Sequence, residues 1–278
     1  MTTTITLLVD NQAETGLKHE HGLSMFIKHQ GKRILFDNGQ DSEALYYNAQ
    51  KLAVSLNDLD IIILSHGHYD HGGNLAALLA ANPNALFYAH PDCTQTRYSL
   101  HPNKDPRTIS LTTETMEAIA AFPEKQKKFI TSATEITPGM WLTGQIPRRC
   151  DLEDTGGPFF LDKEKIEADP LHDDMSLWIE TAAGLTVVCG CCHSGLINTL
   201  THIKSQLPQA TPIKNLIGGL HLVNAKRTRI NATIDYLNKE NISNIYPAHC
   251  TGENAMLMLQ DQVKSNVQIA KAGLKLTL

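Results

Sequence analysis

Three features are missing from this 278-residue sequence, and each absence excludes a class of protein. No apolar run approaches the ~18 to 20 residues of a membrane-spanning helix, so we expect no membrane partner. Basic residues are not in excess, since 24 Lys and Arg stand against 29 Asp and Glu, so we expect no nucleic-acid partner. The amino-terminal residues lack the basic start of a signal peptide, which predicts a cytoplasmic protein.

The composition that is present predicts a folded α/β protein. Hydrophobic residues make up 42% of the chain, enough to bury a large core. Strand-like and helix-like segments alternate, and the succession of strand 59–65, helix 73–82 and strand 85–89 is typical of a parallel α/β unit. We therefore predict one domain over residues 1–278, with an irregular insertion at about 91–174. The insertion is read either as a solvated excursion or as a lid beside a site.

Further elements follow from the same patterns. The amino-terminal eleven residues predict a first strand, and 30–32 predicts a hairpin turn. Other strands are expected at 23–29, 33–37, 128–131, 140–143, 176–181, 185–189, 213–217 and 244–246, and other helices at 42–52, 113–121, 197–206, 227–239 and 255–263.

The strongest chemical signal follows the apolar segment that ends at Ser65. His66 and His68 are two residues apart, so both imidazoles can face the same way at a strand end. Asp70 and His71 follow on the next turn. Imidazole and carboxylate suit Zn²⁺, Mn²⁺ or Fe, and two subsets this close can serve two adjacent metals. Because burying four such groups without partners is costly, we favour a metal centre over a chance cluster.

This His-x-His-x-Asp-His pattern resembles the metallo-β-lactamase superfamily. Leu35–Gly39 is similar to an upstream strand-end motif of that superfamily, and Tyr246–Gly252 looks like the late strand that supplies its last histidine. Shorter motifs resemble the branch named for dihydropterin-ribofuranosylaminobenzene 5′-phosphate synthase of methanopterin biosynthesis. They lie at 20–24, 190–195, 218–222 and 249–252.

The resemblance implies a four-layer αβ/βα sandwich with a metal centre at one edge of its two sheets. His66 and His68 would match ligands of a first metal site, and Asp70, His71 and His249 those of a second. Asp37 would orient a ligand histidine rather than bind metal itself.

The sequence departs from the family pattern where many relatives supply the third ligand of the first site. The matching stretch reads Leu171-His-Asp-Asp-Met-Ser176. Either His172 or one of Asp173 and Asp174 substitutes, or the position is empty.

A second departure places Cys191 where many relatives carry a bridging aspartate after a glycine. If the strand stays extended through residue 193, Cys189, Cys191 and His193 share one face and Cys192 points away. Cys191 and His193 are then candidate metal ligands, and a thiolate favours zinc over Mg²⁺ or Ca²⁺. The alternative is a buried strand end in which cysteine packs as a small hydrophobe.

Other residues are assigned to the substrate side. His221 follows a predicted strand and either donates a proton as a catalytic residue or has a structural role. His19, His21, His29, His101 and His202 are read as surface or fold-supporting histidines, with His21 as the exception to consider for the site. Five basic residues favour a phosphorylated substrate, namely Arg97, Lys104, Arg107, Arg148 and Arg149.

The leading hypothesis is a metal-dependent hydrolase or transferase that uses a metal-bound hydroxide or Lewis-acid centre. One or two Zn²⁺ ions, with Mn or Fe as alternatives, would act on a small anionic substrate such as a pterin-related phosphate. Asp70 would be both a ligand and a catalytic residue that orients the hydroxide. The second hypothesis is a metal-binding ligand sensor with little turnover. The third is a redox protein built on Cys189, Cys191, Cys192 and Cys250.

Overall fold

Two seven-stranded sheets organise the chain, one in each of two units. The structure is a computed structural model that describes residues 2–207 and 211–278. Unit 1 comprises Met1–Ile130, Phe159–Asp169 and Lys271–Leu278, and unit 2 comprises Thr131–Pro158 and Pro170–Ala270.

The sheet of unit 1 changes from antiparallel to parallel pairing at β3. Its order is β17 (Lys275–Thr277), β1 (Thr4–Val9), β2 (Ser24–His29), β3 (Lys32–Phe36), β4 (Ile61–Ile63), β5 (Leu86–Ala89) and β8 (Lys127–Phe129). The pairs from β17 to β3 are antiparallel and those from β3 to β8 are parallel. The predicted hairpin joins β2 to β3, with positive φ at both Gln30 and Gly31, as a tight hairpin turn requires.

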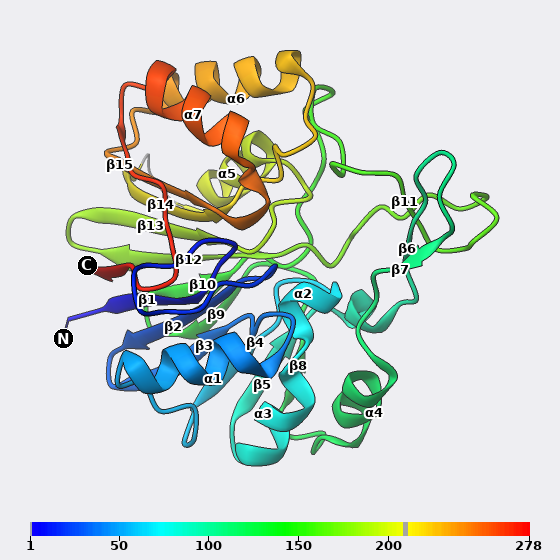
Figure 1. Cartoon of the computed structure of the whole chain (residues 1–278). Coiled ribbons are helices and arrows are strands. Elements are labelled where there is room, and N and C mark those ends of the chain that lie inside the picture. Colours follow the sequence, from blue (N-terminus) through cyan, green and yellow to red (C-terminus); the bar gives the residue numbers. More distant parts are fainter. Residues whose placement is uncertain (1, 208–210) are drawn as a thin grey trace. The chain divides into compact units, whose positions relative to one another are not determined.

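Helices cover one face of this sheet. Figure 1 shows α1 (Ser42–Lys51) and α3 (Leu75–Ala81) on the same side of the strands, and α4 (Thr113–Ala121) belongs to the same apolar cluster. Leu45, Leu78 and Ile119 are buried from the helix side, against strand residues such as Ile62. All three residues of β4 are buried, so the loop after it starts from a well-held position.

The stretch predicted as an irregular insertion contributes to several sheets. β8 extends the sheet of unit 1, whereas β9 (Thr134–Thr137) and β10 (Met140–Leu142) extend that of unit 2. A third, small sheet in unit 1 contains β6 (Tyr98–Ser99), β7 (Arg107–Thr108) and β11 (Phe159–Phe160). The single-domain assignment stays a prediction.

The sheet of unit 2 repeats the plan of unit 1. Its order is β16 (Asn266–Val267), β15 (Asn244–Ala248), β14 (Ile213–Gly219), β13 (Gly184–Cys189), β12 (Ser176–Thr181), β10 and β9. Pairing is parallel from β16 to β13 and antiparallel from β13 to β9. The carboxyl ends of β13, β14 and β15 therefore meet at one edge of this sheet.

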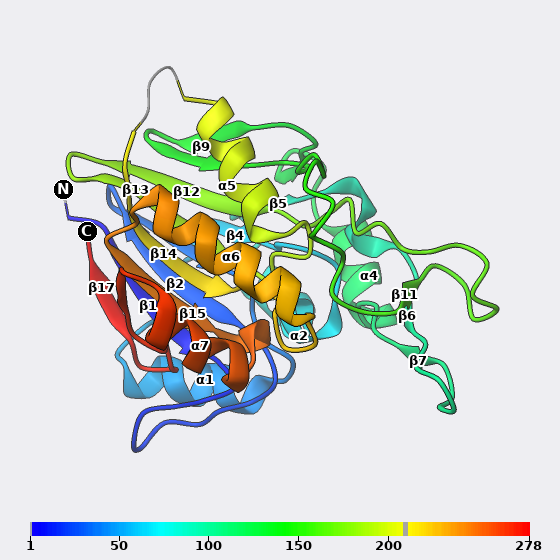
Figure 2. The ribbon, with the colours of Figure 1, turned by 90° about the horizontal axis from the view of Figure 1, so that it is seen from above.

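Three helices pack on the sheet of unit 2. Figure 2 shows α5 (Leu196–Ser205), α6 (Arg227–Glu240) and α7 (Glu253–Gln262) side by side. Leu200, Ile234 and Leu259 are buried in one apolar cluster with Val187 and Ile245 of the strands. No helix in the described part of the chain combines the length and apolar character needed to cross a bilayer.

Candidate metal centre

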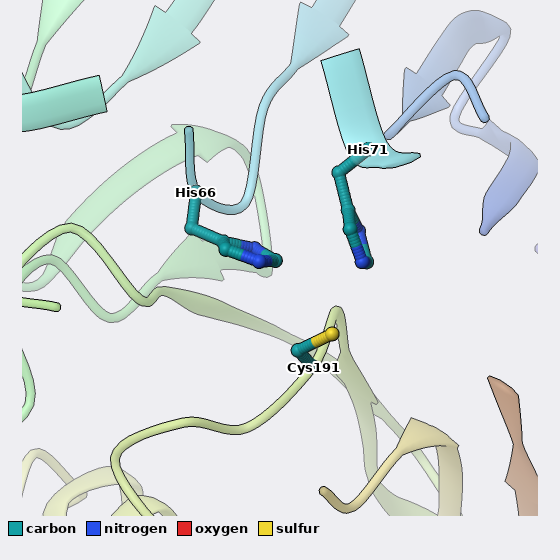
Figure 3. Close-up of side chains that lie close together, drawn as sticks. All are labelled: His66, His71 and Cys191. Carbon is teal, nitrogen blue, oxygen red and sulfur yellow. The ribbon is translucent and has the colours of Figure 1, made fainter. Parts of the chain in front are cut away.

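In unit 1, the loop after β4 carries the predicted ligands on buried positions. His66 and His71 are fully buried, and Figure 3 shows their rings projecting toward one another, with centroids 4.3 Å apart. His66 Nε2 lies 3.0 Å from His68 Nδ1. Two imidazole nitrogens bound to one tetrahedral ion at 2.0–2.1 Å are about 3.3 Å apart, so this pair fits a single cation with little movement.

The glycine between the two histidines is required by close backbone contact. A Cβ at Gly67 would overlap the carbonyl oxygen of Cys93. Cys93 lies in the short η1 helix (Pro91–Thr94) that follows β5, the neighbour of β4. The backbone at Cys93 thus packs directly against Gly67, the residue between the two histidines.

Asp37 orients this loop through hydrogen bonds, as predicted. It is fully buried, and its carboxylate accepts hydrogen bonds from Ser65 N, Ser65 Oγ and His71 Nδ1, each at 2.7 Å. Because a carboxylate only accepts, the proton of His71 lies on Nδ1 and Nε2 is the atom that can bind metal. Ser65 Oγ also lies 2.9 Å from His66 Nδ1, which leaves the Nε2 of His66 for a cation.

Asp70 contacts a histidine outside the predicted ligand set. One of its carboxylate oxygens, Oδ2, lies 3.1 Å from His21 Nε2 and 4.0 Å from His71 Nε2. Asp70 is buried, whereas about half of the His21 side chain is exposed. Its neighbour Tyr69 accepts a hydrogen bond from Arg107 at 2.7 Å.

Unit 2 gathers its own group of buried donors. The donor atoms of Cys191, His193 and His221 all lie within 4.8 Å of one another, and so do those of Cys191, His249 and Cys250. Each of these residues is at most 8% exposed. They follow the carboxyl ends of β13, β14 and β15, the edge at which parallel strands place functional loops.

The strand predicted at 185–189 does not continue to residue 193, so the condition for placing Cys189, Cys191 and His193 on one strand face is not met. β13 ends at Cys189, and Cys192 has a φ of 62°, so the chain turns directly after the strand. Cys191, labelled in Figure 3, lies on this turn, and its donor atom lies near that of His193 because of the turn rather than strand alternation. Cys192 lies against Thr199, with Sγ and Oγ1 3.4 Å apart.

Cys189, the last residue of β13, contacts Cys192 through its thiol. The contact with the Cys189 thiol, together with burial, raises the pKa of Cys192 well above its usual value. The two cysteines form a Cys-x-x-Cys pair, with Gly190 and Cys191 between them.

Residues of the 150s orient the histidines of unit 2. His193 Nδ1 donates to the carbonyl of Thr155 at 2.8 Å, which leaves Nε2 as the donor atom for a cation. The rings of His193 and His221 are 4.1 Å apart between centroids. A Cβ at Gly156 would overlap the ring of His221, so this glycine lets the backbone approach the imidazole closely.

The segment at 172–174 supplies no donor to these groups within the described residues. His172 is exposed and lies 2.9 Å from Gln145 Nε2 through its Nδ1. Asp174 is fully buried and accepts a hydrogen bond from Ser194 N at 2.8 Å. Burial raises the pKa of Asp174. Asp174 thus holds the 190s turn, and Asp173 is buried beside it.

Five basic residues were predicted to favour a phosphorylated substrate. Two of them bind groups of the protein itself. Arg97 is fully buried and forms an ion pair with Asp169 at 3.0 Å. Arg148 donates to the carbonyls of His193 and Pro170, at 2.6 and 2.7 Å. The other three, Lys104, Arg107 and Arg149, are exposed.

Several residues of these groups have strained backbones. Asp37, Cys192, His221 and His249 have φ between 44° and 62°, a region that non-glycine residues rarely adopt. Such strain persists only where the surroundings enforce it, and it concentrates at functional sites. The strained residues are therefore donors, as His221 and His249 are, or lie next to donors, as Asp37 and Cys192 do, which supports a functional role for these donors.

Comparison with known proteins decides the family. Residues 18–203 match the metallo-beta-lactamase superfamily, which is about two thirds of the chain. The chain belongs to the metallo-β-lactamase superfamily. The predicted αβ/βα sandwich of this family is thereby confirmed as the fold class.

Three similar proteins illustrate the match. Two are from Methanocaldococcus jannaschii. One is a 7,8-dihydropterin-6-methyl-4-(beta-D-ribofuranosyl)-aminobenzene-5'-phosphate synthase, 29% identical over 91% of this chain and 88% of its own. The other is the uncharacterized protein MJ0448, 32% identical over 92% and 93% of the two chains. The third is a crystal structure of Tm1679, described as a metal-dependent hydrolase of the beta-lactamase superfamily, with a TM-score of 0.84, 28% identity and 99% coverage of both chains.

The side chains of this protein fit the metal that the family implies. Nitrogen and sulfur donors of the kind that Zn²⁺ prefers gather in buried groups. Two of the histidines, His71 and His193, have Nδ1 engaged by Asp37 and Thr155, an arrangement typical of metal-ligating imidazoles.

Proposed function

We propose that this protein is a metal-dependent hydrolase, or a transferase of the pterin phosphate synthase type, acting on a small anionic substrate. The observation that carries the proposal is the gathering of buried imidazole and thiol donors, in which Asp37 and Thr155 engage the Nδ1 atoms of His71 and His193. The relative described as a metal-dependent hydrolase and the phosphate synthase support the two forms of the proposal.

The proposed metal is Zn²⁺, as one or two ions, with Mn and Fe as alternatives. The proposed ligands are His66, His68, Asp70, His71, Cys191, His193 and His249. When bound, such a metal supplies a Lewis acid and lowers the pKa of a bound water to about 7.

Asp70 has a further role in this proposal, because its carboxylate can both bind a cation and accept a proton or hydrogen bond. Its contact with His21 Nε2 at 3.1 Å provides a route by which a proton on the carboxylate reaches a partly exposed imidazole. His221 is assigned to the substrate side as a proton donor, since its buried ring lies beside that of the proposed ligand His193 and an imidazole can donate a proton.

Arg107 is the basic residue that best supports an anionic substrate. It is exposed, its guanidinium lies 5.0 Å from the ring centroid of Tyr69, and Tyr69 stands between His68 and Asp70 in the metal-binding loop. A guanidinium here can pair with phosphate oxygens in a bidentate manner.

The test is turnover of the zinc-reconstituted protein on pterin phosphates, phosphomonoesters, phosphodiesters and lactones. We expect a rate on at least one phosphorylated compound. We further expect Arg107→Ala to raise KM about 10-fold with a smaller change in kcat, because it contacts substrate away from the reacting atoms. Lys125→Ala, which removes another exposed cation of unit 1, is the matched control and should change neither constant.

A second candidate function, a ligand sensor with little turnover, is favoured by the segment at 172–174. That segment contributes no donor to the groups found among described residues, although the resemblance to the family implies a metal ligand there. No turnover across the panel, together with tight metal binding, would replace the enzyme proposal with the sensor.

A further inference from the structure

Cys250 lies in one of the two donor groups of unit 2, yet no family motif assigns it a role. Its Sγ, the Cys191 Sγ and a ring nitrogen of His249 all lie within 4.8 Å of one another. Cys191 and His249 are each 3% exposed and Cys250 is 8% exposed. Two thiols and an imidazole thus lie close together at buried positions of unit 2.

The backbone around Cys250 is shaped to hold the thiol in this place. β14 and β15 run in parallel with Gly219 opposite Ala248, so the short η2 helix (His249–Thr251) begins next to Gly219. A Cβ at Gly219 would lie 2.6 Å from Cys250 Sγ and 2.5 Å from the carbonyl oxygen of Gly190. Only glycine leaves room for the sulfur there.

Two further contacts fix the turn that presents the thiol. Thr251 Oγ1 accepts a hydrogen bond from Leu220 N at 3.0 Å. His249 has a φ of 48°, which bends the chain at once after β15. Cys250 Sγ lies 3.4 Å from the carbonyl oxygen of Cys191, so the two cysteine residues are in direct contact.

We propose that Cys250 is a metal ligand that forms, with Cys191 and His249, a soft transition-metal site of two thiolates and one imidazole. Two thiolates bound to one tetrahedral ion at about 2.3 Å would be about 3.7 Å apart, within the spread of these donor atoms. Thiolate donors favour zinc, cobalt and cadmium over Mg²⁺, Ca²⁺ and Mn²⁺. The inference rests on the proposed function only in requiring that the chain binds a metal.

Cys191 belongs to both donor groups of unit 2, whereas Cys250 belongs to one. Loss of Cys191 should therefore weaken metal binding at least as much as loss of Cys250. Cys192, on the same turn, lies against Thr199 and should not matter for binding. This difference supplies a matched control for the experiment.

The experiment is cobalt substitution of the full-length protein, read by near-ultraviolet absorption. Each thiolate–cobalt bond contributes a charge-transfer band, so Cys250→Ser and Cys191→Ser should each lose about half of the band. The double variant should lose it entirely. Cys192→Ser should keep the wild-type intensity, and thermal unfolding of each variant checks that it is folded.

A second measurement needs no substitution. Cadmium-113 bound to the wild-type protein should resonate at the shift of a site with two thiolates. A shift typical of one thiolate or none would overturn the inference, as would a cobalt band that is unchanged in folded Cys250→Ser. Either result leaves the proposed function standing if metal still binds, whereas failure to bind cobalt and cadmium would overturn both proposals.

Discussion

Asp37 fills its position because three donors converge on its carboxylate. Ser65 N, Ser65 Oγ and His71 Nδ1 all need an acceptor in a place without solvent. An asparagine of the same shape would present an NH₂ group to at least one of these donors. The carboxylate thus acts through the orientation of its neighbours rather than through contact with substrate.

We therefore expect Asp37→Asn to lower metal affinity or turnover by about 10- to 100-fold. This is the usual effect of replacing a residue that hydrogen-bonds to a metal ligand. Asp70→Asn should cost at least as much, because Asp70 is a proposed ligand and loses its charge. Turnover and metal affinity of the two variants are the measurements. An Asp70→Asn protein with near-normal rate and full metal content would contradict the role assigned to Asp70.

Glu20 gives a pH dependence to stability in unit 1. Burial, with the nearby Asp41 carboxylate, raises its pKa to about 7, against the opposing hydrogen bond from Gln40 N at 2.8 Å. The folded protein therefore holds this proton more tightly than the unfolded chain, whose glutamate has a pKa near 4.5. The stabilisation is complete below pH 4.5 and is lost as the pH rises through 7.

Replacing Glu20 by glutamine should remove this part of the pH dependence. Because the carboxyl is partly exposed, solvent screening limits the effect to about 1 kcal/mol. The measurement is urea unfolding at pH 5 and pH 8. Wild type should lose more stability between the two than Glu20→Gln, whereas Glu117→Gln, an exposed control on α4, should behave as wild type. Equal losses in wild type and Glu20→Gln would disprove the assignment.

His66, His68, Asp70 and His71 form a local pattern, so the sequence alone predicts that these four side chains lie near one another. His21 and Cys250 were harder to place, since their positions depend on contacts with residues 49 and 59 positions away in the sequence. The turn at Cys192 was missed because a cysteine at positive φ has no local signal.

At the scale of elements, the segment 148–157 acts as a brace for the histidines of unit 2. Arg148 donates to the His193 carbonyl, and Thr155 accepts from the His193 ring. Glu153 caps α5 with both oxygens, at 2.8 Å from Ile197 N and 2.9 Å from Asn198 N. The brace therefore positions both the backbone and the ring of His193.

Gly156 tests this element, because a Cβ at this position would overlap the ring of His221. Gly156→Ala should lower turnover at least 10-fold by displacing the imidazole. It should also cost about 1 kcal/mol of stability, since the glycine has a φ of 86°. Gly16 has a φ of 88° with open space around it, so Gly16→Ala is a control for backbone strain alone. Similar turnover of the two variants would show that the brace does not position His221.

The longer elements and the three-residue strands β8 and β10 were predicted well from the sequence, whereas the two-residue strands were not. Helix α4 spans the predicted 113–121, and β12 spans the predicted 176–181, because periodicity and capping residues are local. β6, β7 and β11 have two residues each, too few to show a period. β17 pairs with β1 at the other end of the sequence, a contact that no local pattern indicates.

At the scale of the whole molecule, two sheets of the same plan each deliver loops with metal-binding side chains at strand ends. The fold class followed from the sequence through the family motifs. The domain organisation remains open, because the insertion at 91–174 supplies strands to the sheets of both units. Long-range pairing of this kind cannot be derived from local composition.

The central claim is that this chain binds a transition metal through the histidines, cysteines and carboxylate described above. Elemental analysis of the protein after reconstitution with Zn²⁺ and removal of free metal tests it most directly. We predict one to two equivalents of zinc per chain. The zinc content should be lower in a folded double variant that carries both His66→Ala and His68→Ala. Less than a tenth of an equivalent, with Mn²⁺ and Fe²⁺ giving the same result, would contradict the claim.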